Sequence, residues 1–428
     1  MRKPVNGRRN SYVHLDGMHH PDFHAVEAVL RKQLQNYPGG AAVCVYHHGE
    51  CVVDLWGGYR NEDNDLWRQD TMAPSFSTTK GVCSTLLHIY ADRGLIDYDA
   101  KVCQYWPEFA KAGKSNITVR QVLSHQSGLY HIRQMIDGAD RMLDWDHMIE
   151  AIENTAPVHE PGKRTGYHGL TYGFIIGEII QRVSGKKFAN LVQSEIARPL
   201  NLDGLYIGTP KKELHRAAQL IYPDAARNLS RTKMGHYLEV YASGVSKLLR
   251  GLGVDSDLNS IFDALAPRGI SDFNFGSPES LRVAIPAGNG LFTARSLAIM
   301  YSMLAGGGEF NRVRLLSEHT VDKATTLQKP TGKNSVIPFD MRWRLGYHGV
   351  ATTQGLPKKA FGHFGFGGSG AWADPELDLA VALIVNSGMG SPFGDTRTVR
   401  ISGAALQAAA KRDTIRNTPT RHSLDLAT

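Results

Sequence analysis

Strand-like segments stand at both ends of this chain, and a long helical region separates them. The alternating segments 41–47 and 51–58 predict an N-terminal hairpin with one buried face. Further strands are expected at 342–346, 362–373 and 379–386. Helical patterns dominate from Ser77 to about Leu265. One sheet can unite these strands only if the middle of the chain leaves the sheet and returns, so the sequence predicts a discontinuous α/β domain with an inserted, mostly α-helical domain.

Two helices are expected beside this sheet. The segment 23–36 precedes the hairpin, and 397–411 follows the last strand and would pack on the sheet. The predicted division assigns 1–76 and 285–428 to the sheet domain and 77–284 to the helical domain. Residues 413–428 are expected to form a loosely held tail.

A Ser-x-x-Lys sequence, from Ser77 to Lys80, stands where the first helix of the middle region is expected to begin. Apolar residues follow it at helical spacing, so this helix would be buried. Residues three apart share a helix face, which lets the Lys80 amine reach the Ser77 hydroxyl. Lysine can act as the base for a serine nucleophile only if burial or nearby positive charge lowers its pKa. The pattern therefore predicts a nucleophile and its base in a special environment.

The same pattern occurs twice more, at Ser184 with Lys187 and at Ser230 with Lys233. Ser184 follows an apolar run and precedes Gly185, which indicates the end of a helix. Ser230 lies in a polar, basic stretch where a lysine would stay solvated and charged. For Ser77 the alternative interpretation is a helix-capping serine beside a surface lysine.

The segment Tyr167-His168-Gly169 lies on a predicted loop between a Pro-Gly turn and an apolar helix. A phenol at Tyr167 can relay a proton between serine, lysine and leaving group, or activate the water that clears an acyl intermediate. The alternative is a tyrosine that only packs by its ring.

A third segment, His363-Phe364-Gly365, lies in a strand crowded with glycines. Glycine inside a strand usually marks the close approach of another backbone or a ligand. The main-chain N–H of Phe366 is our candidate to complete an oxyanion hole with the Ser77 amide. Ser369 resembles a nucleophile elbow, but Ala371 stands where the elbow needs glycine and a strand follows instead of a helix.

Together these segments resemble the serine β-lactamase and penicillin-recognising superfamily, most closely the class C β-lactamase-like branch that includes the family VIII carboxylesterases. Further similar stretches occur in the family's order at 39–43, 76–81, 117–129 and 371–375. The resemblance implies a β-lactamase-like fold of the α/β (α+β) class, with a mainly antiparallel sheet flanked by helices. It also implies an active site in the cleft between the sheet and the inserted helical domain.

The resemblance makes Ser77 the acylated nucleophile, Lys80 its partner base and Tyr167 the second proton-handling group. It implies that four further residues bind the substrate: Gly169, His363, Gly365 and Phe366. Gly169 stands where the lactamase motif has an asparagine that holds the drug's amide side chain. His363 stands where that family commonly has a lysine near the drug's carboxylate, and histidine is mostly neutral near pH 7.

Both departures favour a serine carboxylesterase acting on short-chain or small carboxylic esters. Weak hydrolysis of β-lactams stays open because the acylation machinery is shared. A β-lactamase or D-amino-peptide hydrolase, an acyltransferase using the same residues and a non-catalytic relative stay open as alternatives. The expected partner is a small-molecule ester. Aromatic residues of the irregular stretch 224–287 are expected at the rim of the cleft, with core packing as the alternative: Tyr237, Tyr241, Phe273 and Phe275.

Composition limits the other partners. The chain has 428 residues, of which 42% are hydrophobic, so it can bury a large core. Its net charge of +7 is spread along the sequence, which argues against nucleic-acid binding. No apolar stretch is long enough for a membrane helix, and 1–17 lacks the apolar centre of a secretory signal, so a cytoplasmic protein is expected.

Neither a metal nor another cofactor is expected from the sequence. The four cysteines at 44, 51, 83 and 103 lack metal-site or redox spacing and are expected to be reduced and structural. The histidine pairs at 19 and 47 match no recognised zinc motif, and none of the 18 histidines forms His-Glu-x-x-His. The predicted acyl chemistry needs no metal.

Overall fold

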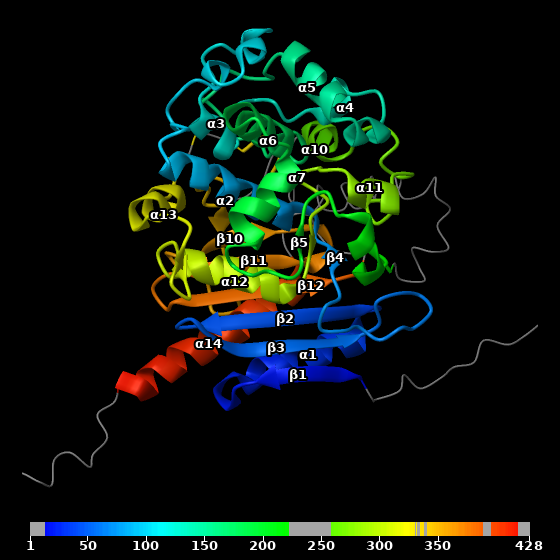
Figure 1. The fold of residues 1–428 in the computed structure, drawn as a ribbon, viewed down its shortest axis with the longest axis vertical. Helices are drawn as coiled ribbons and strands as arrows, with labels where there is room; N and C mark the ends of the chain where they lie inside the picture. The colour runs from blue at the N-terminus through cyan, green and yellow to red at the C-terminus, as the bar shows by residue number, and fades with distance from the viewer. Residues whose placement is uncertain are drawn as a thin grey trace, which may run out of the picture.

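A seven-stranded antiparallel sheet forms the base of the molecule in this computed structural model (Figure 1). The structure describes residues 13–221, 258–329, 331, 334–337, 340–387 and 395–417. The strand order is β1-β3-β2-β12-β11-β10-β9. The strands are β1 (Leu15–His19), β2 (Gly40–His47), β3 (Glu50–Gly58), β9 (His348–Gly349), β10 (Phe361–Phe364), β11 (Gly370–Asp374) and β12 (Leu379–Val385).

The pairing of β2 with β12 joins the two ends of the chain. Its register runs from Ala41 opposite Val385 to His47 opposite Leu379. Both strands are buried on both faces, which suits their nearly continuous apolar sequences. The antiparallel sheet flanked by helices predicted for a β-lactamase-like fold is therefore confirmed.

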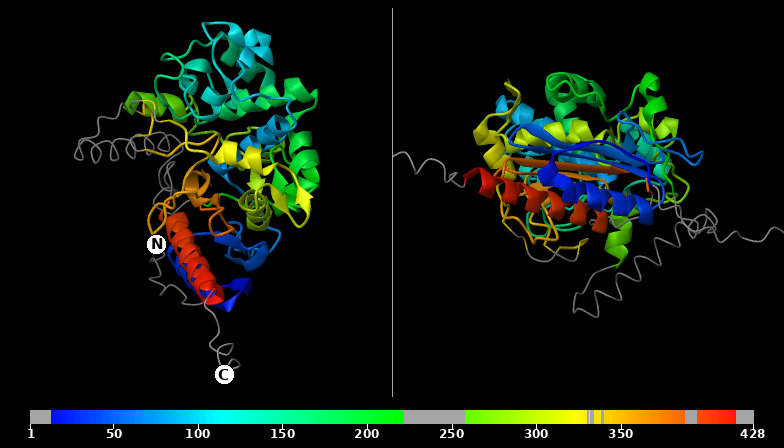
Figure 2. Two further views of the ribbon diagram at one scale, coloured as in Figure 1. Left: turned by 90° about the vertical axis from the view of Figure 1, so that its left-hand side faces the viewer. Right: turned by 90° about the horizontal axis from the view of Figure 1, so that it is seen from below.

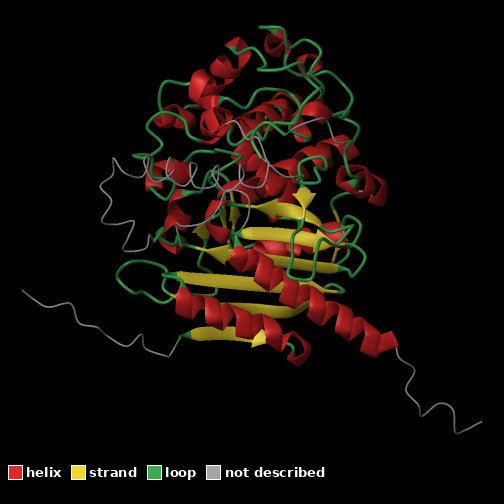
Figure 3. Cartoon of the chain, turned by 180° about the vertical axis from the view of Figure 1, so that it is seen from behind, coloured by secondary structure: helices red, strands yellow, loops and turns green. Residues whose placement is uncertain are grey.

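Helices cover both faces of this sheet. The helices α1 (His24–Asn36) and α14 (Thr396–Asn417) lie side by side on one face, as Figures 2 and 3 show. The helix α12 (Ala294–Ala305) covers the other face. Alternate strand residues enter the two cores: Val43 and Val381 pack with α1 and α14, whereas Ala42 and Ala382 pack with α12.

The remaining helices stack above α12 and carry most of the second core (Figure 1). They are α2 (Thr79–Asp92), α3 (Val119–Leu123), α4 (Ile132–Met135), α5 (Trp145–Asn154), α6 (Thr171–Ser184), α7 (Phe188–Leu191), α10 (Leu258–Leu265), α11 (Pro278–Arg282) and α13 (Glu318–Thr325). Short strands β4 (Ala73–Pro74), β6 (Leu291–Phe292) and β5 (Leu205–Tyr206) form a second sheet, and β7 (Glu309–Phe310) pairs with β8 (Val313–Arg314). The central helix α2 packs against α6, so a buried helix runs through the middle of the helical layer.

Most predicted elements are confirmed, including both flanking helices, the hairpin and the helix that ends at Ser184 before a left-handed Gly185. The predicted strand at 342–346 is wrong, because Arg342 and Gly346 have positive φ and the chain turns there before β9. The predicted strand at 362–373 is interrupted by the 3₁₀ turn Phe366–Gly368, where Gly367 and Gly368 also have positive φ.

The expected tail is also partly wrong. Helix α14 continues through 413–417, and Asp413 is held by contacts to the β2–β3 turn. The predicted domain boundaries stay a prediction. All four cysteine thiols are free. Within the described ranges, no helix combines the length and apolar character needed to cross a membrane.

Candidate active site

Ser77 lies in a short 3₁₀ turn, Phe76–Thr78, between β4 and α2. Phe76 has a φ of +44°, an unusual conformation for a residue with a bulky side chain. The turn is fixed on both sides, because Ser75 donates its N–H to Gly290 O at 2.9 Å and Thr78 Oγ1 donates to Ser369 O at 3.2 Å. The Ser77 side chain is thereby presented at the start of α2 in a half-buried position.

The Lys80 side chain is fully buried beneath Ser77. Its Nζ lies 3.0 Å from Ser77 Oγ, 2.6 Å from Gly169 O and 3.0 Å from Ala287 O. Burial lowers the pKa of Lys80 to about 7, because the charged amine loses its hydration. The special environment that the Ser-x-x-Lys hypothesis requires is therefore present in the structure.

These three neighbours are oxygen atoms that accept from the three N–H bonds of the charged amine. A neutral lysine has two N–H bonds and one lone pair, and the two carbonyl oxygens of Gly169 and Ala287 accept both hydrogens. The lone pair is then left for the Ser77 hydroxyl. In the neutral form the lone pair of Lys80 Nζ therefore faces the Ser77 hydroxyl.

Tyr167 reaches the same oxygen from the other side. Its Oη donates to Ser77 Oγ at 2.9 Å, and its ring stacks on Trp343 with centroids 5.8 Å apart. Burial raises the pKa of the Tyr167 phenol well above its ordinary value, so the group stays protonated. Tyr167 therefore packs by its ring and also contacts Ser77, so both interpretations of this residue describe part of its environment.

Contacts of two histidines, His125 and His168, fix the loop that carries Tyr167. Leu129 donates its N–H to His168 Nε2 at 3.2 Å, and Ser127 Oγ lies 2.6 Å from the same nitrogen. The His125 ring lies 4.9 Å from the Tyr167 ring, and the backbone N–H of His168 donates to His125 Nδ1. Burial lowers the pKa of His168 to about 3, which keeps this network uncharged.

The third motif borders the turn that carries Ser77. A Cβ on Gly365 would lie 2.3 Å from Ser75 O, so only glycine allows β10 to pass this close to the turn that holds Ser77. Phe366 follows directly, and its ring meets the Phe76 ring edge-on at 5.5 Å. The backbone of Phe366 is thereby brought beside the Ser77 turn.

His363 is buried behind the phenol. Its ring lies 6.3 Å from the Tyr167 ring and its Nδ1 is 3.1 Å from Phe364 O. Burial holds the pKa of His363 well below its ordinary value, so the imidazole is neutral. A neutral ring at this position lacks the charge that would attract a substrate carboxylate.

Helix α10 closes the space beside Gly169. A Cβ at this position would lie 2.7 Å from Ala264 O and 2.7 Å from Leu265 Cδ2. An asparagine like that of the lactamase motif therefore does not fit unless α10 moves. The wall at this point of the site consists of a backbone carbonyl and a leucine side chain.

Aromatic rings line the neighbouring side. Phe275 meets Phe76 at 5.5 Å, and Phe273 meets Phe275 at 4.8 Å, all with tilted or edge-on geometry. These rings are half-buried beside the turn that carries Ser77. The other two predicted rim residues, Tyr237 and Tyr241, lie outside the described residues.

Sequence reasoning missed three groups of this site. Ala287 contributes only its backbone carbonyl, which no side-chain pattern reveals. Trp343 fell in a segment interpreted as a strand. His125 lies in the stretch 117–129 that carries part of the family resemblance, and that stretch was the one signal available for it.

Residues 26–406 match the protein-family model described as Beta-lactamase. The chain belongs to the β-lactamase family. It is 35% identical over 379 residues to the Esterase/beta-lactamase LipL of Mycobacterium tuberculosis, covering 84% of this chain and 80% of that protein. The superfamily resemblance expected from the motifs is confirmed.

Solved structures of this family resemble the chain along its length. A family VIII carboxylesterase superposes with a TM-score of 0.79 and 31% identity, covering 92% of this chain and 100% of that one. A penicillin-binding protein homologue from Caulobacter crescentus gives a TM-score of 0.78 and 31% identity, with the same coverage. These similarities support a serine hydrolase of this superfamily.

We expect Gly169→Asn to destabilise the β-lactamase-like fold by about 1–3 kcal/mol, because its Cβ would overlap the Ala264 carbonyl. It should also lower ester turnover, since the Gly169 carbonyl holds Lys80. Urea unfolding and esterase assays measure the two effects.

The matched control is Gly185→Asn. Gly185 has a φ of +68° and open space around its Cβ position, and asparagine tolerates this conformation. If Gly169→Asn were as stable as the wild type, the conclusion that α10 closes the space beside Gly169 would be contradicted.

Proposed function

We propose that this chain is a serine carboxylesterase of the family VIII type, which hydrolyses short-chain or small carboxylic esters through an acyl-enzyme on Ser77. The observation that carries the proposal is the placement of Ser77 Oγ within 3.0 Å of Lys80 Nζ and 2.9 Å of Tyr167 Oη. A neutral amine can act as the base for the hydroxyl, and a protonated phenol can supply the proton that the leaving group needs.

Acylation begins when Ser77 Oγ attacks the ester carbonyl and its proton moves to Lys80. The N–H groups of Ser77 and Phe366 stabilise the oxyanion that forms. As the carbon–oxygen bond to the alcohol breaks, Tyr167 donates its proton to the leaving oxygen and is reprotonated from Lys80. The products of this half-reaction are the free alcohol and the Ser77 ester.

Deacylation reverses these proton movements. A water molecule attacks the Ser77 ester, and Tyr167 relays the water's proton toward Lys80. The same two N–H groups stabilise the second oxyanion. The Ser77 oxygen leaves with the relayed proton, which frees the acid and restores the enzyme.

The walls of the site favour neutral, apolar esters. Helix α10 fills the space where a lactamase asparagine would lie, and His363 offers no positive charge for a carboxylate. The rings of Phe76, Phe275 and Phe366 supply an apolar side for a small acyl or alcohol group. Similarity to a relative named Esterase/beta-lactamase supports weak turnover of β-lactams as a second activity.

Replacement of Ser77 by alanine tests the nucleophile. We expect Ser77→Ala to lower p-nitrophenyl butyrate turnover by at least about 10³-fold while the fold stays intact, because no hydroxyl remains to be acylated. Intact-mass spectra should show an acyl adduct on the wild type and none on the variant.

The matched control for this experiment is Ser184→Ala, which removes the serine of a second Ser-x-x-Lys sequence at the end of α6. Its turnover should equal that of the wild type. Substantial turnover by Ser77→Ala would assign the nucleophile elsewhere, and faster turnover of nitrocefin than of the ester would favour a β-lactamase.

The pH dependence tests the base. Because Lys80 has a pKa of about 7 and acts as the neutral amine, kcat/KM should rise with pH up to about 7 and then level off. Below this pKa the amine is protonated and cannot accept the Ser77 proton, so each unit of pH should lower the rate about tenfold. A rate that still rises tenfold per unit between about pH 8 and about pH 10 would contradict the lowered pKa.

A further inference from the structure

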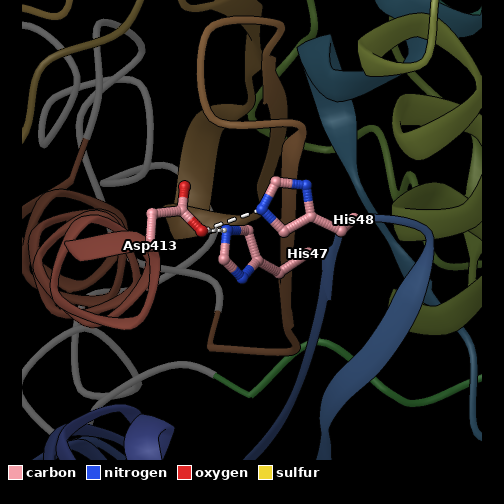
Figure 4. Close-up of side chains that lie close together, drawn as sticks. All are labelled: His47, His48 and Asp413. Atoms are coloured by element: carbon pink, nitrogen blue, oxygen red, sulfur yellow. Dashed lines mark hydrogen bonds and ion pairs between the residues drawn. The ribbon is translucent and has the colours of Figure 1, made fainter. Parts of the chain in front are cut away.

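A group of polar side chains outside the catalytic motifs lies where the β2–β3 turn meets helix α14. His47 ends β2, His48 lies in the turn and Asp413 lies on α14. One ligand atom from each residue lies within 4.8 Å of the other two. Figure 4 shows both imidazoles directed toward one carboxylate oxygen of Asp413.

The distances fit one small metal ion. His48 Nε2 lies 2.8 Å from Asp413 Oδ1, and His47 Nε2 lies 3.3 Å from the same oxygen. A tetrahedral zinc ion with bonds of about 2.0–2.2 Å holds its ligand atoms roughly 3.3 Å apart. His47 is therefore already at this spacing from Asp413, whereas His48 and Asp413 would have to separate by roughly 0.5 Å to admit the ion.

The backbone brings the two histidines to one side. Consecutive residues of a strand normally point to opposite faces. His48 has a φ of +54° and Gly49 a φ of +69°, a turn conformation that usually takes Asn, Asp or Gly at the first position. This turn places the centroids of the two rings 4.1 Å apart. A histidine is strained in this backbone conformation. The His48 side chain is 40% exposed.

His47 supplies the second observation. Its side chain is completely buried, and in the part of the chain that the structure describes its Nε2 makes no hydrogen bond of good geometry. Buried polar atoms normally have a partner. Imidazole nitrogens are common metal ligands, so an ion at this position would supply the missing partner.

Some of the surrounding charged residues favour metal binding and others oppose it. Asp378 Oδ2 lies 3.7 Å from His48 Nδ1, where a carboxylate can orient a metal-bound imidazole. Arg412 Nη1 lies 3.4 Å from His47 Nδ1, so metal binding through Nε2 requires the ring proton to move to Nδ1 and this contact to open. Glu50 lies 2.8 Å from the same guanidinium and already compensates its charge.

We propose that His47, His48 and Asp413 bind one zinc-like divalent cation, which fastens α14 to the β2–β3 turn. Two imidazoles and one carboxylate are ligands that zinc takes in proteins, and the exposed side of the cluster leaves a fourth position to water. The sequence motifs did not reveal this site because 365 positions separate His48 from Asp413.

The test uses the full chain with Zn²⁺ in calorimetry and Co²⁺ as a spectroscopic probe. The variants are His48→Asn, which keeps a residue suited to the turn, and Asp413→Asn, which keeps the side-chain shape. The matched control is His319→Asn, an exposed histidine on α13. We expect both cluster variants to lose at least about 100-fold in zinc affinity and the control to lose none.

A visible absorption band of tetrahedral Co²⁺ should appear with the wild type and the control, but with neither cluster variant. Zinc should also raise the melting temperature of the wild type and not that of the cluster variants. Equal zinc affinity in all four proteins, or no cobalt band in the wild type, would overturn the proposal. Ester turnover is expected to be the same with zinc and with EDTA, which keeps this test separate from that of the proposed function.

Discussion

The burial of one lysine amine is the constraint on which the proposed chemistry depends. The Lys80 side chain on α2 is fully buried, and its amine contacts the backbone carbonyls of Gly169 and Ala287. Relative to an ordinary lysine, a pKa near 7 instead of 10.5 shifts the balance between charged and neutral amine by roughly 5 kcal/mol toward the neutral form. Two carbonyl oxygens fix its hydrogens, so the fold itself aims the lone pair at Ser77.

Glycines allow the backbone to close around that amine. A Cβ on Gly173 of α6 would lie 2.4 Å from Ala287 N, so glycine lets α6 pack against the segment whose carbonyl holds Lys80. Gly365 does the same where β10 passes the turn of Ser77. The sheet and the helical layer therefore meet near Ser77 through backbone contacts that a larger side chain would prevent.

The sequence predicts much of this arrangement because the relevant signals are local. Periodicity identified α1, α14 and the β2–β3 hairpin, and the glycine pattern marked the close approach at Gly365. Contacts made by backbone carbonyls, such as that of Ala287, and contacts between distant residues, such as that of Asp413 with His48, leave no local pattern. The segment 342–346 alternates in sequence like a strand but forms a turn, because Arg342 and Gly346 adopt positive φ.

The most direct measurement is the pKa of the Lys80 amine itself. NMR titration of the full chain with isotopically labelled lysine, with the Lys80 signal assigned from a Lys80→Arg variant, would report it. We expect a midpoint near 7 for this one lysine instead of the ordinary lysine value of about 10.4. A Lys80 midpoint at the ordinary value would contradict the neutral base and the mechanism built on it.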